Sequence, residues 1–171
     1  NTIDPETIIE TVEVVKEVEV TVTETVTVEV DPFADSTLEG VLTSDKTLSS
    51  DKIWLLKGRV VVGDGATLTI PAGTVIKAEP GSGADASTLI VARGGKIDAK
   101  GTASKPIIMT AKADNIQADG TYPATGASLT VNSRGLWGGL LVLGKAPSSF
   151  KGDVSELQIE GIPVSDTNGL Y

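Results

Sequence analysis

Apolar and polar residues alternate along residues 11–30, TVEVVKEVEVTVTETVTVEV. Even positions from 12 onward carry Val except at Lys16 and Glu24, while odd positions carry Thr or Glu except at Val15. A period of two predicts an extended strand with one apolar face. At this length the strand would extend about 65 Å, well beyond an ordinary strand. The pattern therefore predicts a long strand arm whose Val face and backbone polar groups need a partner.

The arm has a boundary on each side. The tetrapeptide DPET offers a helix start, so residues 5–10 are compatible with either a short helix or a strand. In the segment DPFADS, Pro32 cannot continue a strand ladder. We therefore divide the chain into an extended arm, residues 1–31, and a body, residues 32–171.

From Ser36 onward, short apolar runs alternate with Gly, Pro, Asp and Ser. Similar runs recur at an offset of 29 residues, or 32 where three more are inserted. The superposed positions are 60–62 with 89–91, Leu68 with Ile97, and, at the longer offset, Ile76 with Ile108. A period of 20–30 residues with turns at fixed corners is typical of a β-solenoid, in which parallel strands stack coil on coil.

Individual segments of the body have separate predicted roles. In LTIPAGTVIKA, Leu68 and Ile70 should point inward, residues 71–73 should turn, and Val75 should start the next face. Residues 112–134 are polar and lack a period, which indicates an excursion from the solenoid. We expect residues 135–147 to restart the core and residues 156–163 to add a strand. The solenoid end has no obvious cap, so we expect either further chain or another subunit to cover it.

Composition and charge narrow the function classes. The arm holds nine of the 23 acidic residues and one of the 14 basic ones, and so carries nearly all of the net charge of −9. Without a basic patch, nucleic acid is not an expected partner. The chain has no Cys and no His, and no apolar run approaches the ~20 residues of a transmembrane segment. We predict no cofactor and no metal site.

Three segments carry a family resemblance: KIWLLKGRVVVGDGATLTIPAGTVIKA, IDAKGTASKPIIMTA and GLWGGLLVLGKAP. They resemble the first coils of secreted bacterial right-handed parallel β-helix proteins, which are often lipoproteins at the surface of Gram-negative cells. The resemblance covers roughly residues 31–171, and the Leu-Trp-Gly-Gly block is its most specific part. It implies a solenoid fold and an extracellular or outer-surface location, and it implies no settled activity.

Polar residues of the body are weak candidates for chemistry. A glycosidase needs two carboxylates about 5–9 Å apart, and a lyase would need basic residues near its substrate. We assign the candidate carboxylates to turns, where Asp normally caps local backbone, and the clustered basic residues to solvated corners. The carboxylates are Asp64, Asp85, Asp98, Asp114 and Asp119, and the basic residues are Arg93, Lys96, Lys100 and Lys105. Trp54 and Trp137 lie in apolar runs, so we predict core packing for both rather than a sugar platform.

The fold predicted from the sequence is all-β, a right-handed parallel β-helix with an extended N-terminal strand arm. The predicted function is a non-catalytic extracellular structural protein that self-assembles, as a fibre or multimer subunit, by donating the arm to a neighbouring copy. The predicted self-association residues are Val12, Val14, Val18, Val20, Val22, Val26, Val28 and Val30. Three alternatives stay open: several arms twine about each other as a stalk, the arm is a plain tether, or the protein binds or cleaves surface glycans.

Overall fold

The computed structural model describes residues 33–146, 157–163 and 165–169. The chain divides into two units, Asn1–Val30 and Asp31–Tyr171, and every described residue belongs to the second. The predicted strand arm, the ambiguous residues 5–10 and the eight self-association Val residues lie outside the described part. Those predictions therefore stay predictions.

The described residues form short strands and two 3-10 helices. The strands are β1 (Thr37–Leu42), β2 (Lys46–Thr47), β3 (Ile53–Val62), β4 (Thr67–Ile70), β5 (Val75–Ala78), β6 (Thr88–Val91), β7 (Lys96–Ala99), β8 (Ile108–Ala111) and β9 (Gly139–Val142). The 3-10 helices are η1 (Gly83–Asp85) and η2 (Thr167–Gly169). No helix in this part of the chain is long and apolar enough to cross a membrane.

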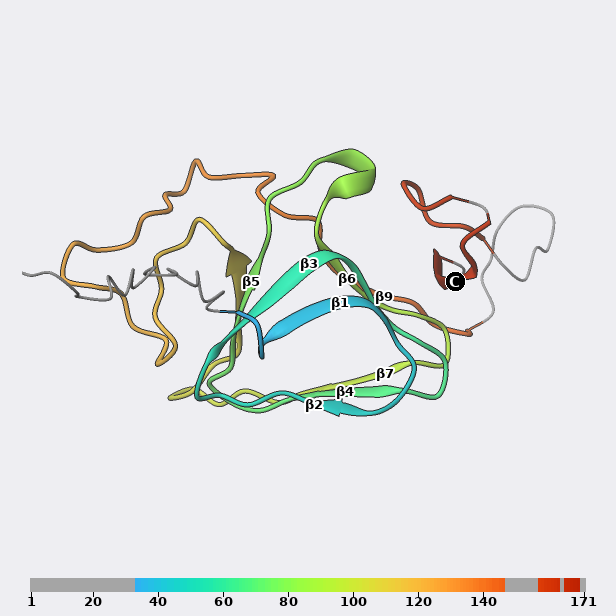
Figure 1. The fold of residues 1–171 in the computed structure, drawn as a ribbon, viewed down its shortest axis with the longest axis horizontal. Helices are drawn as coiled ribbons and strands as arrows, with labels where there is room; N and C mark the ends of the chain where they lie inside the picture. The colour runs from blue at the N-terminus through green and yellow to red at the C-terminus, as the bar shows by residue number, and fades with distance from the viewer. Residues whose placement is uncertain (1–32, 147–156, 164, 170–171) are drawn as a thin grey trace, which may run out of the picture. The chain divides into compact units, whose positions relative to one another are not determined.

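The strands belong to two all-parallel sheets that face each other across the core (Figure 1). The larger sheet has the order β8-β5-β3-β6-β9, with β1 also paired to β3, and the smaller has the order β2-β4-β7. The chain passes through β3 and β4, then β5, β6 and β7, then β8 and β9, so each circuit stacks on the one before. This is a parallel β-helix, as the spacing of apolar runs predicted.

The core consists of ladders of inward side chains, as expected for stacked parallel strands. The 29-residue offset is confirmed: Val60 pairs with Leu89 and Leu68 pairs with Ile97. At the LTIPAGTVIKA corner, Leu68 and Ile70 are buried in the core and β5 begins at Val75, also as predicted.

One predicted pairing is wrong by a residue. Ile76 pairs with Met109, and Val75 pairs with Ile108. Both Ile76 and Met109 pack on the core, whereas a slip of one residue would turn Ile108 inward instead. The polar loop between β7 and β8 sets this register, and its length has no periodic signal in the sequence.

A bend divides the larger sheet into two halves. The first four residues of β3 pair with β5, and its last four pair with β6. Between them stands Gly58, with φ of 62°, in a region that L side chains rarely adopt. Its N–H donates to Ser87 Oγ at 3.1 Å. The single strand β3 can therefore line both halves because glycine lets it turn.

Two segments depart from the regular coils. Residues 112–138 contain no strand, which agrees with the predicted excursion, and β9 then restarts the core. The strand predicted for residues 156–163 is not formed in the described residues 157–163, where Gln158 makes only an isolated bridge. The reason is local: the Gln158 side-chain amide donates to backbone carbonyls of residues 162, 163 and 166, which folds this segment into a compact turn.

Candidate functional site

A buried polar cluster lies on the outer side of the first half of the larger sheet. Ile76 and Ala78 of β5 face the core, so Lys77 projects outward, yet it is only 8% exposed. Its Nζ donates to the backbone oxygen of Asp114 at 2.7 Å. The Asp114 carboxylate accepts hydrogen bonds from Thr110 Oγ1 at 2.7 Å and from the Ile116 N–H at 3.2 Å. The cluster fastens the start of the excursion to the coil.

The electrostatics of this cluster follow from burial. Burial lowers the pKa of Lys77, and the nearby Asp114 charge offsets part of that effect. Burial, together with the Asp114 charge and a hydrogen bond to it, raises the pKa of Tyr122. An amine with a lowered pKa is a possible base, but one that is buried and bonded to backbone has little access to a substrate. The geometry therefore favours a structural role for Lys77.

The five candidate carboxylates have local partners or local turn positions. Asp64 lies 3.6 Å from Lys145 Nζ, and the Asp119 carboxylate accepts from both the N–H and the hydroxyl of Thr121. Those Thr121 hydrogen bonds lower the pKa of Asp119. Asp85 lies exposed in η1. Among described residues, no group of three or more His, Cys, Asp or Glu side chains is placed to hold a metal ion.

Two of the turn assignments made from the sequence are wrong. Asp98 and Lys96 both lie within β7 rather than in a turn. The period-two pattern KIDA is short, and its charged residues occupy the solvent side of an edge strand. Asp98 pairs with Lys100 at 3.1 Å on the exposed surface, Arg93 is in the turn after β6, and Lys105 lines a cavity described next.

A cavity of about 440 Å³ lies between a corner of the coils and the excursion. The corner contributes Gly73, Lys105 and Pro106, and the excursion contributes Asp119 and Thr121. Asp119 is the one carboxylate among its lining residues, and its Oδ1 accepts both hydrogen bonds from Thr121 within its own turn. The cavity has a mixed polar and apolar lining without the paired carboxylates of a glycosidase.

The two tryptophans pack as the sequence predicted. Trp54 is 5% exposed in the core, and its indole N–H donates to the Ser49 carbonyl at 2.9 Å. Lys46 and Lys52 lie over its ring at 5.4 and 5.2 Å from the centroid. Trp137 is partly buried against the same core. A buried Trp54 cannot serve as an open stacking platform for a sugar.

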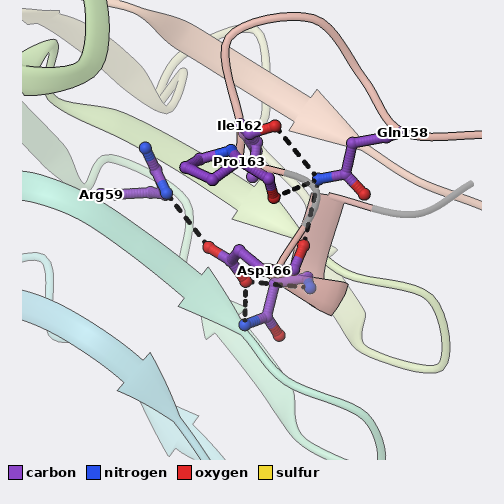
Figure 2. Close-up of polar contacts among 6 residues, drawn as sticks. Arg59, Gln158, Ile162, Pro163 and Asp166 are labelled. Atoms are coloured by element: carbon purple, nitrogen blue, oxygen red, sulfur yellow. Dashed lines mark hydrogen bonds and ion pairs between the residues drawn. The ribbon is translucent and has the colours of Figure 1, made fainter.

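The C-terminal segment, residues 157–169, covers the outer side of the second half of the larger sheet. Val61, Ile90 and Ala92 form a small outer apolar cluster, against which Leu141 and Ile162 pack. Figure 2 shows the polar contacts that hold the segment. Arg59 donates to the Asp166 carboxylate at 3.0 Å, and the Gln158 side-chain amide donates to three backbone carbonyls. Burial by itself would raise the pKa of Asp166, but hydrogen bonds from Asn168 and Arg59 outweigh it and lower that pKa.

The last coil leaves core positions exposed. Leu140 pairs with Leu89 and Val142 with Val91, and both of these β6 partners are fully buried core residues. Paired residues of parallel strands point to the same side of the sheet, so Leu140 and Val142 face the core. They are nevertheless 43% and 62% exposed. We call this exposed apolar surface of β9 the open end of the core; the inward residues of β8 are better covered, since Ala111 is 4% exposed and Met109 is partly buried.

The sequence predicted an uncapped solenoid end without naming the residues that it would expose, and it did not assign the buried cluster. A lone charge inside the apolar run TVIKA was a usable signal for Lys77, because charged residues are rarely buried without a partner. Leu140 and Val142 had no such signal, since the 51-residue step from Leu89 to Leu140 has no periodic counterpart.

Comparison with known proteins gives one match. A family model described as a pectate-lyase-like β-helix domain matches residues 40–170. No curated protein and no solved structure matches the chain. The family match agrees with the stacked parallel coils and with the β-helix resemblance of the sequence, while the bacterial cell-surface origin implied by that resemblance stays a prediction.

Proposed function

This chain belongs to the pectate-lyase-like β-helix domain family, and on that premise we propose that it is a non-catalytic structural protein that assembles with copies of itself. The exposure of Leu140 and Val142 at core positions carries the proposal. Exposed apolar groups at a strand edge favour pairing with another strand. The N-terminal arm of a neighbouring copy is predicted to offer such a strand, with a Val face that is interrupted at Lys16 and Glu24.

The non-catalytic part of the proposal is supported by the positions of the polar groups. Lys77 is buried against Asp114, and Asp119 closes its own loop. Binding or cleavage of surface glycans receives less support, because a single carboxylate lines the 440 Å³ cavity and Trp54 is buried. As part of the same proposal, the protein acts at the outer surface of a Gram-negative cell or outside it, as the sequence resemblance implies.

The proposal is tested by placing charge on the open end. The double variant Leu140→Asp/Val142→Asp keeps both side chains where solvent already reaches them, so the coils below should remain folded. Val131→Asp is the control, because Val131 is 89% exposed in the excursion, away from the core. Sedimentation velocity and negative-stain microscopy should show oligomers or fibres for the unchanged chain and for the control, and monomers for the double variant. A monomeric unchanged chain at high concentration would overturn the proposal.

A further inference from the structure

We infer that residues 20–28 of a neighbouring copy add to the open end of the core as a parallel strand lying across β8 and β9. The inference rests on the proposed function and names the segment and the register of the contact. The strand β3 shows how one strand can line both halves of the larger sheet.

The inward residues of β3 come in two pairs on either side of the bend. Trp54 and Leu56 precede Gly58, and Val60 and Val62 follow it, all four being core residues. The first pair is aligned through β5 with Met109 and Ala111 of β8. The second pair is aligned through β6 with Leu140 and Val142 of β9. A strand added at the open end therefore needs four apolar residues with the same intervals of two, four and two.

The arm contains this spacing. Val20, Val22, Val26 and Val28 have the intervals of the four β3 residues, and Glu24 stands at the position of Gly58. A Cβ built on Gly58 meets no atom within 4 Å, so space allows a side chain at the bend, although the positive φ strains any L residue there. The odd positions from 21 to 27 are all Thr, which suits a strand face that reaches solvent.

A second stretch, residues 12–20, has the same intervals around Lys16, and side-chain pairing decides between the two. In the 20–28 register, Thr21 lies opposite Thr110 and Thr27 lies opposite Leu141. In the 12–20 register, Glu19 would lie opposite Leu141, against the outer apolar cluster. A carboxylate there would lose hydration without gaining a partner.

Charge on the outer side of the sheet favours the same register. Glu39, Lys57, Glu79 and Lys112 follow one another from coil to coil, with ion pairs of 3.3 Å between Lys57 and Glu39 and 3.1 Å between Lys112 and Glu79. This column of alternating charge ends on Lys112 at the open end. In the 20–28 register Thr23 lies opposite Lys112, whereas in the 12–20 register Val15 would, so the first register places a polar residue at the end of this column.

A matched pair of double variants tests the register in the full-length chain. Val22→Thr/Val26→Thr and Val14→Thr/Val18→Thr make the same nearly isosteric change on either side of a polar residue, Glu24 in one case and Lys16 in the other. Hydroxyls facing Ala111 and Leu140 would weaken the contact, so the first pair should raise the dissociation constant roughly tenfold or more. The second pair should change it by less than about threefold.

The bend supplies a second, sharper test at Glu24. Glycine adopts positive φ easily and Val very poorly, so Glu24→Gly should tighten association and Glu24→Val should weaken it. If association depended only on the apolar area and strand propensity of the arm, Glu24→Val should tighten it and Glu24→Gly should weaken it. Val adds apolar area, and glycine disfavours the strand.

The outcomes separate this inference from the proposed function. Assembly that is abolished by Leu140→Asp/Val142→Asp, but is affected equally by the two Val→Thr pairs or strengthened by Glu24→Val, would overturn the register and leave self-assembly standing. Assembly that is insensitive to Leu140→Asp/Val142→Asp would overturn both.

Discussion

The two ends of the solenoid core differ in how well they bury equivalent residues. In the first coil, Leu38 faces the core from β1 and is 2% exposed. In the last coil, Leu140 and Val142 occupy the same kind of inward position and remain open to solvent. An inward direction within a coil is therefore not sufficient for burial: Leu38 is covered although β1 pairs, among the described strands, with β3 alone, whereas Leu140 and Val142 in β9 are not covered.

The largest predicted effect compares the same substitution at the two ends. Leu38→Ala should lower the free energy of unfolding by about 2–4 kcal/mol, since it removes buried methyl groups and leaves a cavity. Leu140→Ala should cost about 1 kcal/mol or less in the dilute monomer, because much of the side chain is already hydrated. Urea denaturation followed by circular dichroism measures both.

Protein concentration sharpens the same comparison. If the open end is covered in an assembly, the destabilisation by Leu140→Ala should grow as concentration rises, while that by Leu38→Ala should stay constant. Equal costs for the two variants in dilute solution would contradict the description of an open end.

A smaller loss of stability is expected from a substitution in the C-terminal segment, which packs on Leu141 at the outer side of β9. The pKa of Asp166 lies below its usual value of 3.8 in the folded chain, so the fold favours the charged carboxylate. Its contribution is present above about pH 4 and is lost as pH falls through the lowered pKa. Asp166→Asn should therefore cost about 1 kcal/mol at neutral pH.

The pH dependence of that cost identifies its cause. The stability difference between the unchanged chain and Asp166→Asn should shrink below about pH 4, as measured by thermal unfolding across an acid pH series. Arg59→Ala should remove most of the effect of Asp166→Asn in a double-variant cycle. A difference that persists undiminished in acid would show that the carboxylate charge is not what holds the segment.

The smallest effect is expected on the exposed charge column. Lys57→Glu places a third acid between Glu39 and Glu79, and because the side chains are largely solvated, the cost should stay below about 1 kcal/mol. Salt near 1 M should remove most of it, whereas the effect of Leu38→Ala should be unchanged. A salt-independent loss would mean that the column packs more tightly than its ion pairs indicate.

The sequence predicted the regular part of the fold well because its signal is periodic. Inward Val, Leu and Ile residues 29 positions apart identified the pairing of β3 with β6 and of β4 with β7. Prediction failed where loops set the geometry: Ile76 was assigned the wrong partner, and Gln158 folded a predicted strand into a turn. Polar loops of unequal length carry no period, so register beyond them cannot be counted from the sequence.

The sequence by itself determined that the body stacks parallel strands around an apolar core, and it predicted an arm with one Val face. Both follow from local alternation and from repeats, which act within a strand or between neighbouring coils. Only the tertiary structure decided which inward residues stay uncovered and which outward residues become buried. Leu140 is 43% exposed although it pairs with the buried Leu89, and Lys77 is buried because the excursion folds over it, and both outcomes depend on contacts between segments far apart in the chain.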